Sequence, residues 1–121
     1  MYGVNVKSES VPDGVDINAP GAKADAGKPR VGLVTGGFPR ALLAVSDLAT
    51  KGAAKYTENG WREVENGFKR YTDALGRHLL KEGIEKYDAD PKMAGVLHAT
   101  QVAWNALARL ELLLMEEDDD E

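Results

Sequence analysis

Three segments of this chain repeat apolar residues every three to four positions, the spacing that places them on one face of an α-helix. The first begins at Phe38-Pro39 and ends near Tyr56, and its proline suits the first helical turn because the missing N–H is not needed there. The second covers Gly67–Glu82, and the third and most apolar covers residues 91–115. Short connections join them, so the sequence predicts a mainly α protein with a compact three-helix core.

The two ends of the chain lack this periodicity. Glycine and proline interrupt residues 1–36 too often for a long element, so we expect an irregular N-terminal arm, in which residues 4–6 and 31–34 could pair as short strands. Residues 116–121 are all acidic, and such a run repels itself and predicts a disordered tail. We therefore expect one domain over residues 1–115, a size that suits a single core.

Composition excludes several classes of protein. The chain has no cysteine, which rules out a disulfide scaffold, a thiolate zinc site and a cysteine nucleophile. No apolar run approaches the roughly 18 residues that a membrane span needs, and the N-terminus lacks a signal pattern. We expect a cytoplasmic protein without a membrane partner.

Charge is distributed unevenly along the chain. The net charge is −5, with −8 over residues 82–121 and +3 over residues 1–81. Duplex nucleic acid does not suit an acidic protein, because affinity for its backbone depends on neutralising many phosphates. A local basic patch can still bind one small polyphosphate. A nucleotide or another phosphorylated small molecule is therefore the expected partner.

The stretch GAKADAGKPR, residues 21–30, is the first candidate for such a patch. Its two glycines permit backbone conformations that expose N–H groups, and Lys23, Lys28 and Arg30 add positive charge. The order of residues is not that of a P-loop. An arm that carries lysines without forming a site is the alternative interpretation.

A second candidate group lies where the first helical segment ends. Tyr56 and Trp61 could stack on a base while Lys55 and Arg62 supply positive charge for a phosphate. Alternatively, Trp61 anchors a loop or the core.

Polar stripes border the apolar faces of the other two helical segments. On the second, Arg70, Asp73 and Arg77 recur at spacings of three and four, next to His78. These residues either line a cleft or form an ordinary surface ion pair.

The third helical segment carries the stripe of His98, Gln101 and Asn105, also at spacings of three and four. Side chains of this kind need hydrogen-bond partners if they are buried. A ligand, the second helix or water would each serve.

Acidic residues follow the second helical segment. Glu85 and Asp88 are three apart, and Mg²⁺ takes oxygen ligands and bridges to substrate phosphates. A solvated acidic loop is the alternative. The chain has two histidines, far apart in sequence, so the sequence does not support a histidine-rich metal cluster.

Taken together, four stretches resemble the dATP/dGTP diphosphohydrolase N-terminal domain family of small phage-encoded proteins. They are residues 21–30, 51–62 (KGAAKYTENGWR), 70–80 (RYTDALGRHLL) and 98–112 (HATQVAWNALARLEL). The resemblance implies a helical nucleotide-handling protein, in the host cytoplasm if it is phage-encoded. It is similar in theme to the MazG-type all-α pyrophosphohydrolases, which use carboxylate-held Mg²⁺ to cut a nucleoside triphosphate into monophosphate and pyrophosphate.

By this resemblance we expect hydrolysis of dGTP or dATP, with Asp73, Glu85 and Asp88 as the catalytic carboxylates that hold Mg²⁺. We also expect a homo-oligomer, because a shallow surface on a small core becomes a pocket most readily at an interface between copies. The expected ligand-binding residues are Lys23, Lys28, Arg30, Lys55, Tyr56, Trp61, Arg62, Arg70, Arg77, His78, His98, Gln101 and Asn105.

Two departures from the expected pattern support an alternative. Glu85-Lys86-Tyr87-Asp88 matches the Glu-x-x-Asp half of the MazG-type metal signature, but no segment supplies Glu-Glu-x-x-Glu, and Gln101 stands where we expect a second histidine. The alternative is a non-catalytic protein that sequesters a host immune signalling nucleotide, such as a cyclic oligonucleotide or an ADP-ribose derivative. If no nucleotide binds, an interaction module with a charged surface remains.

Overall fold

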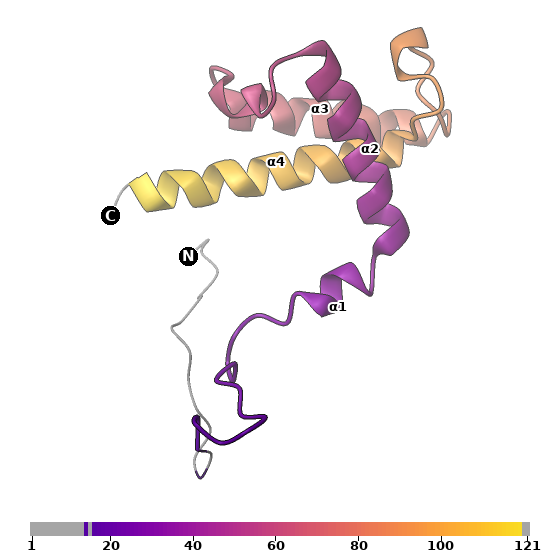
Figure 1. Cartoon of the computed structure of the whole chain (residues 1–121). Helices are drawn as coiled ribbons and strands as arrows, with labels where there is room; N and C mark the ends of the chain where they lie inside the picture. The colour runs from indigo at the N-terminus through magenta and orange to yellow at the C-terminus, as the bar shows by residue number, and fades with distance from the viewer. Residues whose placement is uncertain (1–13, 15, 120–121) are drawn as a thin grey trace.

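A computed structural model describes residue 14 and residues 16–119 (Figure 1). The mainly α fold is confirmed. The elements are α1 (Gly32–Thr35), α2 (Pro39–Lys55), the 3-10 helix η1 (Gly60–Glu63), α3 (Gly67–Glu82), the 3-10 helix η2 (Pro91–Met93) and α4 (His98–Asp119).

Helix α4 is the centre of the fold. It contacts both α3 and α2, whereas α2 and α3 do not contact each other. Figure 1 shows α3 running alongside α4 while α2 crosses it. The two helices thus occupy separate parts of the α4 surface, and this separation positions the site described below.

The pairing of α3 with α4 is fixed by close contacts near Gly67 at the start of α3. Gly67 is buried, and a Cβ at this position would lie 3.2 Å from Cδ1 of Leu112. Near it, Nε of Arg109 donates a hydrogen bond of 2.7 Å to Oγ1 of Thr72, and the guanidinium lies 4.8 Å from the centre of the Phe68 ring. An apolar contact and a polar contact therefore hold the same register.

The predicted bounds of the first two long helices are confirmed. Helix α2 begins at Pro39 and ends at Lys55, one residue before Tyr56, and α3 covers the predicted residues with Gly83 as its C-cap. Proline in the first turn and glycine after the last turn are local signals, which explains why the sequence predicts these ends well.

The predicted start of the third long helix is wrong. Asp90 and Pro91 do begin a helical turn, and the Asp90 carboxylate accepts a hydrogen bond of 3.0 Å from the backbone N–H of Lys92. That turn is η2, and it ends at Met93. Gly95 then adopts a φ of +82°, which a continuing right-handed helix does not allow, so α4 starts only at His98.

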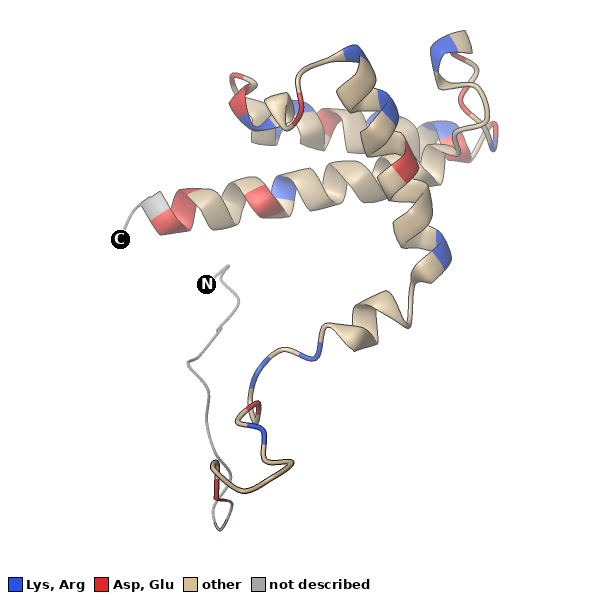
Figure 2. Ribbon diagram, viewed as in Figure 1, with Lys and Arg blue, Asp and Glu red and all other residues tan. Residues whose placement is uncertain are grey.

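The predicted disordered tail is wrong for residues 116–119, which continue α4. Adding residues to a long, packed helix costs little once the helix exists, and glutamate is a good helix former. Figure 2 shows acidic residues gathered at this end of α4. Residues 120 and 121 lie outside the described residues.

The N-terminal arm does not form the predicted strand at residues 31–34. These residues belong largely to α1, where the backbone N–H of Gly36 bonds to the carbonyl of Gly32 at 2.8 Å. The described residues provide no partner strand for this segment, whereas a helical turn satisfies its backbone locally. The other predicted strand, residues 4–6, lies outside the described residues.

Beyond the long helices, Tyr87 and Leu97 form an isolated antiparallel bridge. Within the described part of the chain, no helix has both the length and the apolar character needed to cross a bilayer.

Candidate functional site

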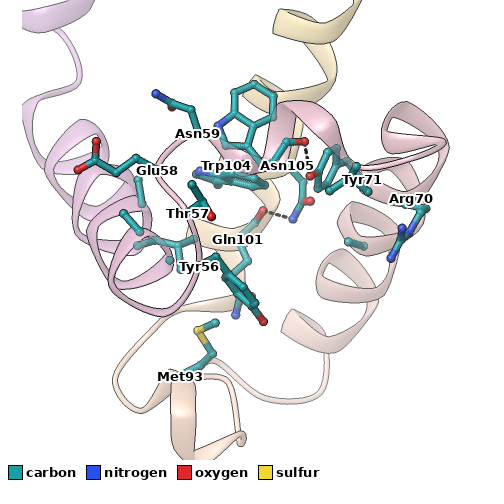
Figure 3. Close-up of a pocket in the computed structure, with 18 of the residues that line it drawn as sticks. Tyr56, Thr57, Glu58, Asn59, Arg70, Tyr71, Met93, Gln101, Trp104 and Asn105 are labelled. Atoms are coloured by element: carbon teal, nitrogen blue, oxygen red, sulfur yellow. Dashed lines mark hydrogen bonds between the residues drawn. The ribbon is translucent and has the colours of Figure 1, made fainter.

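A groove of ≈ 1220 Å³ lies over α4 between α2 and α3 (Figure 3). It exists because both helices pack on α4 without meeting each other. Its walls come from the second half of α2, the turn before η1, η1 itself and α3, and its floor comes from α4. Of the predicted site residues, those that line it are Tyr56, Trp61, Arg70, Asp73, Arg77, His78, Gln101 and Asn105.

Three aromatic rings meet in the groove. Trp61, Tyr71 and Trp104 lie edge to face, with ring centroids 5.6–6.3 Å apart. The hydroxyl of Tyr71 donates a hydrogen bond of 2.7 Å to the carbonyl of Trp61, which ties η1 to α3. Burial raises the pKa of the Tyr71 phenol above its ordinary value, and the charge of Arg70 offsets part of this rise. The cluster is therefore a fixed aromatic surface in the groove.

Sequence reasoning missed Tyr71 and Trp104 as groove residues because both fall on the apolar faces of their helices. The sequence signal that could have identified them was the chemistry of the side chains and not their spacing along the helix. Tryptophan and tyrosine carry a polar group that needs a partner when buried, which sets them apart from the leucines on the same face.

Helix α3 supplies the charged wall of the groove. Arg70, Asp73, Arg77 and His78 all line it, so the polar stripe borders a cleft. In Figure 3, Arg70 projects from α3 at the edge of the pocket. Two guanidinium groups with a carboxylate between them suit an anionic ligand that also needs a proton acceptor nearby.

The floor of the groove is polar and buried. Gln101 and Asn105 are 8% and 6% exposed, and Nδ2 of Asn105 donates a hydrogen bond of 2.8 Å to the carbonyl of Gln101 (Figure 3). Nε2 of Gln101 donates a hydrogen bond of 2.6 Å to Oδ2 of Asp88. The stripe on α4 thus finds its partners within the chain, as buried polar groups must.

A histidine–carboxylate cluster lies at the start of α4, next to this floor. Nδ1 of His78 and Nδ1 of His98 are 2.9 Å apart, and Nε2 of His98 is 3.0 Å from Oε1 of Glu85. His98 is fully buried. One nitrogen from each histidine and one carboxylate oxygen of Asp88 all lie within 4.8 Å of one another. The cluster adjoins the groove in two places. His78 lines the groove, and Gln101, which also lines it, donates the hydrogen bond to Asp88.

The loop between α3 and α4 brings these groups together by folding back on itself. The backbone N–H of Asp88 bonds to the carbonyl of Val96 at 2.9 Å, and the N–H of His98 bonds to the carbonyl of Lys86 at 3.1 Å. These bonds flank the bridge between Tyr87 and Leu97. Glu85 and Asp88 are thereby held against the first turns of α4.

The electrostatics of the cluster follow from burial and hydrogen bonding. Burial by itself would raise the pKa of Asp88, but the N–H of Asp90 and the side chain of Gln101 donate to its carboxylate, and the pKa falls below its ordinary value. Burial lowers the pKa of His78, and the neighbouring His98 lowers it further. Both effects favour an ionised Asp88 facing a neutral His78.

The two histidines, far apart in sequence, meet in the structure. They are separated in sequence, but α3 and α4 run side by side and place their rings 5.2 Å apart. Separation along the chain does not limit contact between two packed helices.

The predicted set of three carboxylates is not brought together. Asp73 lies on the groove wall, and within the described residues it does not belong to the group that could hold an ion. Two imidazole nitrogens and one carboxylate do not fit Mg²⁺, which prefers oxygen ligands. Imidazole suits first-row transition metals.

The remaining predicted residues lie outside the groove. Lys23, Lys28 and Arg30 are on the arm, which Figure 2 shows extending away from the long helices. Lys55 and Arg62 lie beside the groove, with their charged groups 5.0 Å from the centre of the Tyr56 ring and 5.5 Å from the centre of the Trp61 ring.

Fold and groove together define a small all-α domain whose groove combines aromatic rings, guanidinium groups and buried amides. The chain belongs to the family described as dATP/dGTP diphosphohydrolase, N-terminal, whose sequence model matches residues 18–121. The family name is that of a nucleotide hydrolase. Comparisons with curated proteins and with solved structures found no match.

Proposed function

We propose that this chain binds a purine deoxynucleoside triphosphate, dATP or dGTP, in the groove and hydrolyses it to the monophosphate and pyrophosphate. The observation that carries the proposal is the continuity of the groove. It leads from the aromatic cluster, past two arginines on α3, to the buried amides of the α4 floor. Membership of the dATP/dGTP diphosphohydrolase family supports the choice of substrate.

The aromatic cluster is assigned to the base. The rings of Trp61 and Trp104 meet edge to face, and a base can stack on the face of one of them. Stacking of a base on an aromatic ring contributes about 1–3 kcal/mol. Hydrogen-bonding groups stand close by, because Asn59 and Asn105 also line the groove. Amide side chains can donate and accept, as recognition of a purine edge requires.

The α3 wall is assigned to the phosphates. Arg70 and Arg77 lie one turn from Asp73 on either side, and all three line the groove. In the reaction, water adds to the α-phosphorus while the bond from that phosphorus to the bridging oxygen breaks, and pyrophosphate leaves. The arginines offset the negative charge that develops on the phosphates, and the carboxylate of Asp73 accepts the proton of the water.

We still expect Mg²⁺ to bind to the phosphates of the nucleotide, because phosphate oxygens and water are the ligands it prefers. A bound divalent ion would supply charge neutralisation at the phosphates.

The direct test is incubation of the purified chain with each common nucleoside triphosphate and Mg²⁺, with products separated by ion-exchange chromatography. We expect monophosphate and pyrophosphate from dATP and dGTP. Asp73→Asn should lower kcat by roughly 10²-fold to 10⁴-fold with little change in nucleotide affinity. The matched control is Asp47→Asn, because Asp47 is an exposed helical aspartate that pairs with Lys51 and does not line the groove.

The alternative function, sequestration without hydrolysis, gives a different result in the same experiment. Binding in the aromatic and arginine-lined groove does not require hydrolysis. Under this alternative, a nucleotide would bind tightly in calorimetry without Mg²⁺ and be recovered unchanged after denaturation. If no nucleotide binds at micromolar protein, neither function holds.

The proposal includes a homo-oligomer. Among the described residues, the buried apolar set is small and consists of Ala24, Val96 and Ala108. The arm meanwhile exposes Val31, Leu33, Val34 and Phe38. A second copy is the partner we assign to this apolar surface, and the cationic arm of one copy would then be free to lie near the groove of another.

A further inference from the structure

The two histidines present an arrangement that the proposed function does not use. Their Nδ1 atoms face each other at 2.9 Å, and at least one must lack a hydrogen, since two N–H groups cannot point at each other at this distance. The pair therefore shares either a single hydrogen or a cation.

The surroundings of His98 decide which of its nitrogens is free. Its Nε2 is 3.0 Å from Oε1 of Glu85, and an ionised carboxylate only accepts hydrogen bonds. Nε2 therefore carries the hydrogen, and in the neutral ring Nδ1 presents a lone pair toward His78. A carboxylate that orients a histidine in this way is the usual outer partner of a metal-binding imidazole.

Asp88 supplies the third ligand atom. Its Oδ1 accepts the N–H of Asp90 at 2.9 Å, and its Oδ2 accepts Nε2 of Gln101 at 2.6 Å. An ionised carboxylate has about four acceptor positions, so two hydrogen bonds leave it able to bind an ion. These two bonds hold the group in place beside both histidines.

The distance between the nitrogens selects a coordination geometry. With metal–nitrogen bonds of about 2.1 Å, a separation of 2.9 Å subtends an angle of about 90° at the metal. A tetrahedral ion would need a separation of about 3.4 Å. Adjacent positions of an octahedron fit the observed value, and two histidines with one carboxylate leave further positions for water or an anion.

We propose that His78, His98 and Asp88 bind one divalent first-row transition metal ion through both Nδ1 atoms and the carboxylate, with Glu85 as the outer partner of His98. In this state the His78 ring carries its hydrogen on Nε2. Because His78 also lines the groove, this site adjoins the groove. Binding of the ion is independent of the proposed function, and only its use in hydrolysis rests on it.

The test titrates metal ions into the untagged full-length chain after treatment with a chelator, without nucleotide. Calorimetry should give one Co²⁺ or Mn²⁺ per chain, and Mg²⁺ should bind at least ~100-fold more weakly because the site offers two nitrogens. The absorption spectrum of the Co²⁺ form should be weak, as six-coordinate Co²⁺ gives, and not the intense spectrum of a tetrahedral site.

Variants assign the ligands. Asp88→Asn keeps the shape of the side chain but removes its charge and one of its two acceptor oxygens, and His78→Gln removes the imidazole of a half-buried side chain. Each should weaken Co²⁺ binding by at least ~100-fold. Glu85→Gln should weaken it by roughly 10-fold. The matched control Asp90→Asn keeps the cap of η2 and lies outside the cluster, so its affinity should not change. Circular dichroism verifies that each variant folds.

The proposal fails if no transition metal binds below millimolar concentration, or if His78→Gln and Asp88→Asn both bind Co²⁺ as tightly as the natural chain. The first result would identify the pair as a hydrogen bond between two imidazoles. Failure of the proposed function is distinguishable, since it would appear as normal Co²⁺ binding without hydrolysis of any nucleotide.

Discussion

The N-terminal arm and the start of α4 place polar and apolar side chains in opposite environments. On the arm, Leu33 and Phe38 keep 60% and 58% of their surface exposed. At the start of α4, His98 is fully buried, and Gln101 lies almost as deep. The usual distribution of residue types is thus reversed in both regions.

The difference shows which region finds partners for its side chains within one chain. The polar side chains of α4 can be buried because α3 and the following loop supply partners for them, such as Glu85 and Asp88. The apolar side chains of the arm stay exposed because the described part of the chain offers no face to cover them. The start of α4 therefore satisfies its buried polar groups within one chain, whereas the described residues leave the apolar side chains of the arm uncovered.

The largest effect is expected from replacing exposed apolar side chains of the arm by aspartate. In Leu33→Asp with Phe38→Asp, two apolar contacts of about 1.5–3 kcal/mol each are lost, which weakens association roughly 10³-fold. Light scattering after size exclusion should show an oligomer for the natural chain and a monomer for this variant. Ile84→Asp, at an exposed apolar position outside the arm, should keep the oligomer. A natural chain that is monomeric at high concentration would refute the assigned partner.

Removing His98 should have the next largest effect. His98→Ala leaves a cavity and deprives His78 and Glu85 of a partner, so the metal-free chain should lose about 3 kcal/mol of unfolding free energy. Ile84→Ala, at a side chain that is 86% exposed, should change it by less than about 0.5 kcal/mol. Urea denaturation with a chelator present measures both. Equal effects would mean that burial does not distinguish the two positions.

A smaller loss is expected from the contact between the groove floor and the loop. Gln101→Met keeps the volume of the side chain but removes the donor to the Asp88 carboxylate. A hydrogen bond to a charged group contributes about 1.5–3 kcal/mol, so the free energy of unfolding should fall by that amount. Urea denaturation measures the loss. A variant as stable as the natural chain would show that water replaces the bond.

The smallest effect should come from the aromatic cluster. Tyr71→Phe removes the hydrogen bond to the carbonyl of Trp61 and should cost about 1 kcal/mol at pH 7.

The pH dependence of this variant provides a second check. The folded-state pKa of Tyr71 is raised, so the contribution of its neutral phenol is complete below pH 10.0 and is lost as pH rises through the folded-state value. The advantage of the natural chain over Tyr71→Phe should therefore shrink above pH 10.0. A constant difference between the two chains across this range would contradict the assigned burial.

The sequence predicts local structure well because local structure depends on neighbouring residues. Pro39 and Gly83 mark helix ends, and the three-to-four spacing of apolar residues identifies α2 and α3. The prediction fails at α4, where Asp90-Pro91 begins a turn that Gly95 interrupts, because a cap signal does not say how far a helix continues.

The candidate site divides in the same way. The polar stripes on α3 and α4 are visible in the sequence, since spacings of three and four place residues such as Arg70 and Arg77 on one helix face. Which stripe meets which partner is not visible, because it depends on how two helices pack. Tyr71 and Trp104 therefore read as ordinary apolar residues until the packing places them in a groove.

By itself, the sequence determined that this chain is helical, where α2 and α3 begin and end, and which side chains border their apolar faces. Only the tertiary structure decided that His78 and His98 meet, that Asp88 joins them while Asp73 does not, and that the arm lies away from the groove. The reason is physical. Helix periodicity is encoded over a few neighbouring residues, whereas the contact between α3 and α4 is set by packing across the whole helix pair.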